Sequence, residues 1–266
     1  MIAMRETLRL REDVTLNSSI MLIGLHGWGN GGQVSTHTVQ YLINTFQATR
    51  YGEIISDQYH HFQIERPLVT VKQGIMESYH PPKNKLFYWQ DPAVEHDLLL
   101  LQGTEPHINW ANYARVILEL AKNQNVQRIF TIGGYLTDVA SVDSLPVSAS
   151  TNNSNLINEL TRAEVILTNY TGPTSIYSEI SWQGKPQNID VISLWCGVPY
   201  YIKDLFPPAV FQILTKIQLL SDLVVDFTAL QQEVDRYLET GNDSHLQRQS
   251  GTSFSTTNPS KEMYIA

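Results

Sequence analysis

Hydrophobic positions follow two different spacings along the chain, and these predict strands and helices in alternation. Continuous apolar runs, such as the one from Ile20 to Leu25, are typical of strands that are covered on both faces of a sheet. Shorter apolar runs flanked by polar or turn-forming residues are typical of other strands. On these grounds, strands are predicted at residues 20–25, 68–71, 86–89, 97–102, 128–132, 145–148 and 190–195.

Apolar residues that recur every three or four positions predict helices between these strands. In residues 33–47, for example, Val39, Leu42, Ile43 and Phe46 make one apolar face. Further helices are predicted at residues 109–123 with Asn109 as N-cap, at residues 155–163, from about Pro208 onward, and around residues 227–238 with Asp226 as N-cap.

Strands that alternate with helices indicate a three-layer α/β domain whose sheet is mainly parallel. The chain has no internal repeat and no break in composition before residue 240, so we expect a single domain over residues 1–240. Residues 241–266 are rich in Asn, Ser, Thr and Gln, with few apolar residues. We expect this segment to form a mobile tail.

Composition narrows the functional classes. The 42% hydrophobic content supports a packed core, and a net charge of -8 without a run of Lys or Arg argues against a nucleic-acid or anionic-membrane binder. The single cysteine, Cys196, excludes an intramolecular disulfide, as expected in a reducing compartment. Residues 1–13 are too charged for a signal peptide, and no apolar run approaches the roughly 20 residues of a membrane span. We therefore expect a cytoplasmic protein.

A glycine-rich turn, residues 27–32, follows the first buried strand and precedes a predicted helix. In α/β proteins such a turn lets the backbone approach a ligand closely, and the amides at the start of the helix are unpaired donors. The same layout is also simply a tight turn with close packing of helix on strand. The sequence leaves both interpretations open.

Two catalytic interpretations of this turn lack their companion residues. His26-Gly27 resembles the oxyanion loop of α/β-hydrolases, but the chain has no Gly-x-Ser-x-Gly nucleophile elbow, and Cys196 does not provide one. The turn also lacks the lysine of a phosphate-binding loop. Glu53, the acidic residue nearest to the place of a ribose-binding carboxylate, does not lie in a strand-like pattern.

Residues that follow the predicted strands form a candidate binding cleft, because α/β folds bind ligands at the carboxyl ends of their strands. Glu105 is the most interesting of them, and the alternative is that it caps the next helix or pairs with an arginine. The aromatic residues are as readily explained by rim packing. The candidate cleft comprises Trp28, Asn30, Gly31, Gly32, Glu105, Asp138, Tyr170 and Trp195.

No complete catalytic set and no metal site are predicted. The eight histidines show no pair at metal-ligand spacing, and the adjacent His60 and His61 point in different directions. We therefore expect no metal and no cofactor.

Several blocks, taken in order, resemble the proteasome assembly chaperone 2 family in its prokaryotic branch, over about residues 22–238. The most specific block is Gly103-Thr104-Glu105-Pro106-His107 followed by Trp110. The other blocks are Gly27-Trp28 with Asn30, Arg66-Pro67, Gly133 with Leu136 and Asp138, Pro146-Val147, Tyr170 with Gly172-Pro173-Thr174, and Ser193-Leu194-Trp195 with Val198-Pro199 and Tyr201.

The resemblance implies a three-layer α/β fold similar to that of nucleoside phosphorylases and self-association into a trimer, a larger ring or another symmetric oligomer. For eukaryotic and archaeal relatives it implies guidance of proteasome subunits, with no established chemistry. Three places depart from the family pattern. Residues 140–144 and Tyr200 stand where bacterial members carry histidines and an arginine, and Tyr264 lies one position too early for C-terminal docking.

The sequence therefore favours a non-enzymatic protein that self-associates and holds protein partners. The alternative is a small-molecule binder or an enzyme that acts on a nucleoside-like or carboxylated ligand in the strand-end cleft. Asn30, Glu105 and Asp138 would then supply the polar groups, and Trp28, Tyr170 and Trp195 the walls.

Overall fold

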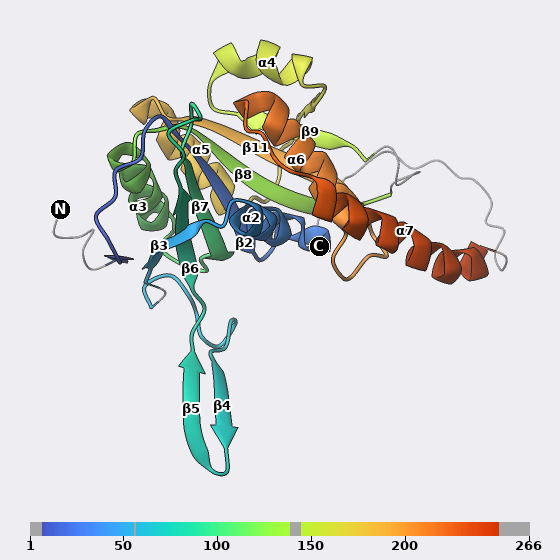
Figure 1. The fold of residues 1–266 in the computed structure, drawn as a ribbon, viewed down its shortest axis with the longest axis horizontal. Coiled ribbons are helices and arrows are strands. Elements are labelled where there is room, and N and C mark those ends of the chain that lie inside the picture. Colours follow the sequence, from blue (N-terminus) through green and yellow to red (C-terminus); the bar gives the residue numbers. More distant parts are fainter. Residues whose placement is uncertain (1–6, 56, 139–144, 250–266) are drawn as a thin grey trace.

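One nine-stranded sheet with helices on both faces organises the molecule in the computed structural model (Figure 1). The structure describes residues 7–55, 57–138 and 145–249, with residues 240–249 described by their backbone alone. The strands run in the order β1-β3-β6-β7-β2-β8-β11-β9-β10. Their bounds are β1 Leu8–Leu10, β2 Ser19–His26, β3 Thr49–Ile54, β6 Asn84–Trp89, β7 Leu98–Thr104, β8 Val126–Thr137, β9 Val147–Thr151, β10 Ile166–Leu167 and β11 Asp190–Pro199.

The α/β class predicted from the sequence is confirmed, but the sheet is mixed. The central strands β7, β2, β8 and β11 are mutually parallel, as the alternation of strands and helices predicts. β6, β3 and β1 continue the sheet in antiparallel fashion on one side, and β9 joins β11 antiparallel on the other. A short loop joins β6 to β7, and a short loop permits an antiparallel pair but not a parallel crossover.

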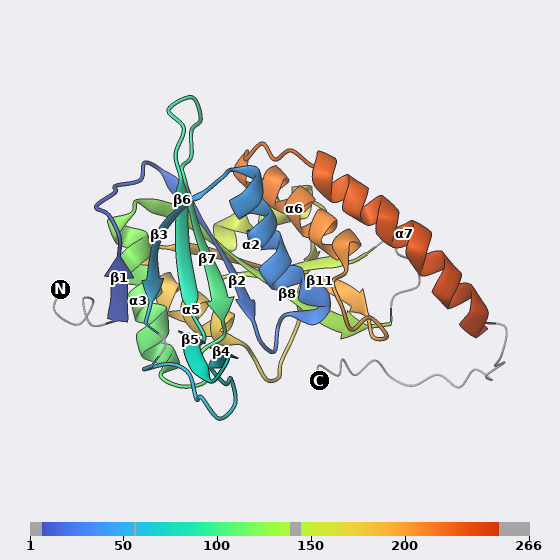
Figure 2. The ribbon, with the colours of Figure 1, turned by 60° about the horizontal axis from the view of Figure 1, so that its bottom comes forward.

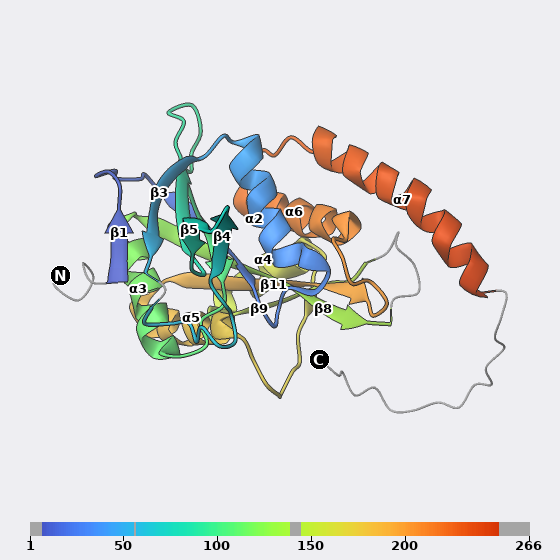
Figure 3. The same ribbon diagram turned by 90° about the horizontal axis from the view of Figure 1, so that it is seen from below.

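The helices divide between the two faces of the sheet (Figures 2 and 3). Both faces of β2 and β7 are covered, which explains their continuous apolar runs: Leu22 and Leu100 belong to one core cluster, while Ile23 and Leu101 belong to the other. The helices are α2 Val34–Thr45, α3 Trp110–Asn123, α4 Ile157–Arg162, α5 Ile176–Gly184, α6 Pro207–Ser221 and α7 Thr228–Gln249, with short 3-10 turns at Gly31–Gln33, Ser154–Leu156 and Lys185–Gln187.

Three predicted boundaries are wrong. β8 does not end at residue 132, because Gly133 and Gly134 stay in register with Trp195 and Cys196 and the ladder continues to Thr137. β11 likewise continues to Pro199. The last helix passes Gly241 and ends at Gln249, since one glycine inside a helix costs only about 1 kcal/mol. Residues 250–266, the rest of the predicted tail, lie outside the described part of the chain.

The predicted strand at residues 68–71 exists but lies outside the main sheet. It is β4, Leu68–Lys72, and it pairs only with β5, Ile75–His80, in a separate two-stranded hairpin. Gln73 and Gly74 form its turn with φ of 50° and 82°, the combination of two positive φ values that suits a tight hairpin turn. Figure 1 shows this hairpin projecting from the sheet.

No helix in the described residues is both long enough and apolar enough to cross a membrane.

Candidate functional site

The glycine-rich turn packs tightly against the neighbouring strand and loop. A Cβ atom added at Gly31 would lie 2.9 Å from the Gly134 carbonyl oxygen, and one at Gly32, whose φ is 57°, would lie 2.9 Å from Phe206 Cβ. The Gly134 amide donates to the Gly29 carbonyl oxygen at 2.8 Å. These glycines are therefore required for close backbone packing, which favours the tight-turn interpretation.

The side chain of Asn30 forms hydrogen bonds within the protein. Its Oδ1 accepts a hydrogen bond from the Thr36 amide at 3.1 Å, and its Nδ2 donates to Thr36 Oγ1 at 3.1 Å. Thr36 lies in the first turn of α2, so Asn30 satisfies one of the amides that a helix start leaves unpaired. The Asn30 side chain therefore caps the start of α2.

Glu105 joins three segments that are far apart in sequence. One carboxylate oxygen accepts from the Trp28 amide at 3.2 Å, and the other accepts from the Ile176 amide at 2.9 Å. Its own amide donates to the His26 carbonyl oxygen at 2.7 Å. The carboxylate therefore ties the glycine-rich turn to the first residue of α5. A capping role was among the alternatives, but the capped helix is α5 rather than α3, the next helix.

The environment of Glu105 raises its pKa above the ordinary value. Burial, which penalises the charged carboxylate, is the largest cause, and the two backbone amides oppose it. A carboxylate with a raised pKa at strand ends is a feature of many functional sites. Both oxygens are nevertheless occupied by backbone donors.

Aromatic rings cover this junction. The centroid of Trp195 lies 6.5 Å from that of Trp28 and 6.1 Å from that of Tyr177, both edge to face. The Trp195 ring also lies over Gly133, where no side chain would fit. Tyr177 is fully buried, and its hydroxyl contacts both Ser35 Oγ at 2.9 Å and the Leu25 amide at 3.0 Å.

Sequence reasoning missed Tyr177, because α5 itself was not predicted. The helix reads Ile-Tyr-Ser-Glu-Ile-Ser-Trp-Gln-Gly, with serines, aromatic and β-branched residues of modest helix propensity and only a short apolar face. Ser175 accepts from the Tyr177 amide and is the one local start signal that was available.

The structure brings together some of the predicted cleft residues and leaves others apart. Trp28, Glu105 and Trp195 form one cluster. Asp138 is exposed directly after β8, and Tyr170 is exposed with its hydroxyl donating to the Pro173 carbonyl oxygen at 2.8 Å. Within the described residues, no hydrogen bond or ring contact links these two side chains to the cluster. The altered family positions 140–144 lie outside the described residues.

The prediction for Glu53 is wrong, because this residue does lie in a strand, β3. Its carboxylate is ion-paired with Arg50 at 3.1 Å and Arg9 at 3.3 Å. β3 has a mixed polar sequence, and its inward-facing residues alternate only over a short stretch. Its sequence pattern therefore does not indicate a strand. These ion pairs account for an acidic residue at position 53, and no ribose-binding role is needed to explain it.

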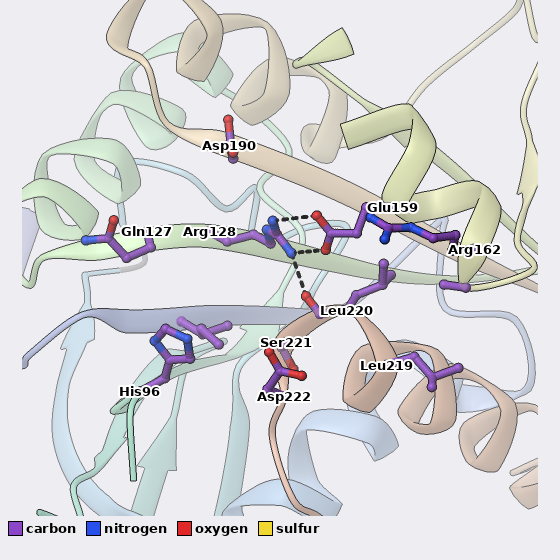
Figure 4. A pocket seen from close by; sticks show the side chains of 12 residues that line it. His96, Gln127, Arg128, Glu159, Arg162, Asp190, Leu219, Leu220, Ser221 and Asp222 are labelled. Atoms are coloured by element: carbon purple, nitrogen blue, oxygen red, sulfur yellow. Dashed lines mark hydrogen bonds and ion pairs between the residues drawn. The ribbon is translucent and has the colours of Figure 1, made fainter. Parts of the chain in front are cut away.

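A cavity lies at the other end of the parallel strands, where β2, β8 and β11 begin (Figure 4). It has a volume of about 670 Å³. Arg128, its most buried cation, donates to both carboxylate oxygens of Glu159 and to the Leu220 carbonyl oxygen. The Arg128 guanidinium is therefore already paired within the protein.

The described residues contain no group of three or more His, Cys, Asp or Glu side chains placed to hold a metal ion. The rings of His60 and His107 lie near each other, with centroids 5.6 Å apart. The His107 Nδ1 accepts from the His61 amide at 3.1 Å, so this ring nitrogen is already in use.

Comparisons with known proteins identify relatives of this fold. The sequence model of the PAC2 family matches residues 24–241. The chain is similar to the proteasome-assembly chaperone homologue of Mycobacterium tuberculosis, with 21% identity, a TM-score of 0.78, and coverage of 85% of this chain and 95% of that one. No curated protein matches the chain.

Two further solved structures are similar. A PAC2 family protein from Streptomyces avermitilis is 23% identical with a TM-score of 0.77, over 87% of this chain and 97% of that one. PbaB, an archaeal proteasome activator from Pyrococcus furiosus, is 21% identical with a TM-score of 0.72, over 90% of this chain and 98% of that one.

Proposed function

The chain belongs to the PAC2 family, and we propose that it is a non-enzymatic, assembly-chaperone-like protein that associates with itself and holds protein partners. The observation that carries this proposal is the hairpin of β4 and β5. Its large apolar side chains are more than half exposed on a projecting element. Large exposed apolar patches of this kind mark protein interaction sites.

The strand-end junction supports the same proposal. Asn30 and both oxygens of Glu105 bind backbone or side-chain groups of the protein itself. Glycines 31 and 32 are packed against neighbouring atoms rather than open to a ligand. The junction therefore has the chemistry of a structural joint. Relatives described as a proteasome-assembly chaperone homologue and a proteasome activator make subunits of proteasome-like particles the first partners to test.

Self-association is tested on the full chain by light scattering over about 1 to 100 μM, the range in which a contact worth 6–8 kcal/mol becomes populated. We expect the mass to rise above 30.2 kDa, the mass of one chain, and to depend on concentration. A mass that stays at one chain throughout this range would overturn the self-association part of the proposal.

A second candidate function is a small-molecule binder, and the raised pKa of Glu105 beside Trp28 and Trp195 is the observation that favours it. A ligand that binds only the folded chain raises its melting temperature by mass action. Nucleosides and small carboxylates are the probes. A melting-temperature rise that Glu105→Gln removes would support this function, and the absence of any rise would reject it for these ligand classes.

A further inference from the structure

A small polar hollow lies between α5 and the strands β9 and β11. It has a volume of about 260 Å³, and none of the residues that line it belongs to the cluster of Trp28, Glu105 and Trp195. It is lined from the sheet and from one face of α5 and the turn after it, by Ser150, Ser193, Ser178, Ser181, Trp182 and Lys185. We call this cavity the Trp182 hollow.

A row of hydroxyl groups crosses three strands on the sheet side of the hollow. In the strand register, Ser193 of β11 lies opposite both Thr131 of β8 and Ser150 of β9. Val191, two positions before Ser193, belongs to the core cluster that contains residues of α5, so these hydroxyls face the side of the sheet that α5 covers. A sheet face beneath a helix is normally filled by apolar side chains. Packing alone therefore does not account for this row.

Ser193 has hydrogen-bonding capacity that the described part of the protein does not use. Its Oγ lies 2.5 Å from Thr131 Oγ1, and either hydroxyl can be the donor. Thr131 is fully buried and Ser193 is 6% exposed. Two hydroxyls share one hydrogen bond between them, so one O–H of the pair is left over. Ser193, unlike Thr131, lines the hollow, and its hydroxyl can therefore donate to a bound molecule there.

Trp182 and Lys185 add an aromatic ring and a positive charge to the other side of the hollow. Trp182 is 76% exposed, an unusual position for so large an apolar side chain. Among the residues that the structure describes, its indole N–H, the Lys185 ammonium and the Ser150 and Ser181 hydroxyls have no protein partner. No acidic residue lines the hollow, although the chain carries a net charge of -8. These groups are therefore available to a ligand, and the charge favours an anionic one.

Hydrogen bonds from Asn152 fix the helix side of the hollow relative to the sheet side. Its Nδ2 donates to the Ser181 carbonyl oxygen at 3.0 Å and to the Ile189 carbonyl oxygen at 2.9 Å. Its Oδ1 accepts from the Val191 amide at 3.0 Å. One side chain thus links β9, α5 and the start of β11. A site whose walls are fixed before binding loses less entropy when a ligand binds.

We propose that the Trp182 hollow binds a sugar ring that carries one anionic group, such as a hexose phosphate or a hexuronic acid. The indole ring offers a flat apolar surface to the C–H face of the sugar. The serine hydroxyls both donate and accept, as sugar hydroxyls do, and Lys185 supplies the charge that pairs with the phosphate or carboxylate. A nucleobase fits this chemistry less well, because the side-chain amide of the hollow, Asn152, is fully used within the protein. The inference does not depend on self-association or on protein partners.

The first test locates binding with fluorine-19 NMR on the full chain, in which 5-fluorotryptophan replaces the five tryptophans. The signal that is missing from Trp182→Phe is assigned to Trp182. We expect glucose 6-phosphate and glucuronate to shift this signal with a Kd of about 0.1 to 1 mM, as suits a ligand of this size. Uncharged glucose should bind about three- to fivefold more weakly, because an exposed ion pair adds only modestly to affinity.

The second test measures the affinity of variants by saturation-transfer NMR of the sugar. Trp182→Ala should weaken the binding of glucose 6-phosphate about five- to tenfold. Lys185→Gln should lower the affinity for glucose 6-phosphate to that for glucose and leave glucose binding unchanged. The matched control is Lys203→Gln, which removes an exposed lysine at the far end of β11, roughly 33 Å along the strand, and should change neither affinity. All three side chains are exposed, and thermal melts verify that the variants fold.

Several outcomes would overturn the sugar site. A Trp182 signal that does not move with either charged sugar at about 10 mM is one of them. Inorganic phosphate that binds as tightly as glucose 6-phosphate would reduce the hollow to an anion site, and tighter binding of uridine 5′-monophosphate than of both sugars would reject the sugar assignment. A shift of the Trp28 signal with Trp182 unchanged would place binding at the strand-end junction, in favour of the second candidate function.

Discussion

Glu105 accepts a hydrogen bond from the Ile176 amide at 2.9 Å, across 71 positions of sequence. The other oxygen of the same carboxylate holds the Trp28 amide. One side chain thus fixes the glycine-rich turn against the start of α5. Removing the Glu105 carboxylate is therefore a direct test of how the strand-end junction is held.

Replacing Glu105 by Gln should destabilise the fold by about 1–3 kcal/mol. The amide side chain has one acceptor oxygen for two backbone donors, so one partly buried N–H loses its partner. Urea unfolding measures the change. The control is Glu119→Gln on α3, where the exposed carboxylate pairs only with Arg115 at 3.6 Å, and there we expect a change within about 0.5 kcal/mol. Equal effects at both positions would contradict the structural role of Glu105.

The raised pKa of Glu105 predicts a particular pH dependence. Because the folded state binds this proton more tightly than the unfolded state, the stabilisation is fully present below the unfolded pKa and is lost as pH rises through the folded pKa. The stability of the wild type minus that of Glu105→Gln should therefore decrease from about pH 4 to about pH 7. Thermal melts of both proteins measure this difference. A difference that grows with pH would show that the folded pKa is lowered instead.

For His107 we expect the opposite pH dependence, in which stability is lost as pH falls. Burial, followed by the proximity of His60, lowers the pKa of His107, while Glu65 opposes them. Stabilisation from neutral His107 is present above its ordinary pKa of about 6.5 and is lost as pH falls. We expect hydrogen exchange of the His61 amide, which donates to His107, to accelerate relative to that of core amides when pH falls from about 7.5 to about 5.5.

The matched protein for that measurement is His107→Asn, in which no imidazole titrates at this position. Its His61 amide should show no additional acceleration at acidic pH. An acceleration of the same size in both proteins would assign the effect to a group other than His107.

The effects of substitutions at Gly133 and Trp195 on the free energy of unfolding should be strongly non-additive. A methyl group at Gly133 would meet the Trp195 ring, so Gly133→Ala should cost about 1–3 kcal/mol through overpacking. In a Trp195→Ala background the same substitution should cost much less, because the ring is absent. A double-mutant cycle by urea unfolding measures the coupling. Additive effects would show that Gly133 is required for some other reason.

The sequence was sufficient for elements whose pattern is local. β2 and β7 are buried on both faces, so their composition alone marks them as central strands, and α3 has a clear apolar face. Asn109 occupies the predicted N-cap position of α3, but its side chain donates to the Gln58 carbonyl oxygen instead of capping the helix. Asp226 does accept from the Thr228 amide, as predicted for the start of α7.

The remaining features depend on contacts between distant segments. Residues 68–71 have the pattern of a strand, but nothing local indicates that this strand leaves the main sheet. Of the predicted cleft residues, Trp28, Glu105 and Trp195 meet because β2 and β7 end close to the level of Trp195, which lies inside the longer strand β11. That Glu105 binds Ile176 could not be predicted, because it requires α5, whose sequence has little helical signature.

The residues that meet at Glu105 are far apart in sequence, and this separation also sets the order in which parts of the fold form during synthesis and folding. Residues 28, 105 and 176 must all be present before both hydrogen bonds can form, and contacts of such long range form slowly. The hairpin of β4 and β5 joins residues no more than 12 positions apart, and hairpins of this kind form within microseconds. The growing chain therefore presents the finished hairpin, with Met76 and Tyr79 exposed, well before the main sheet is complete.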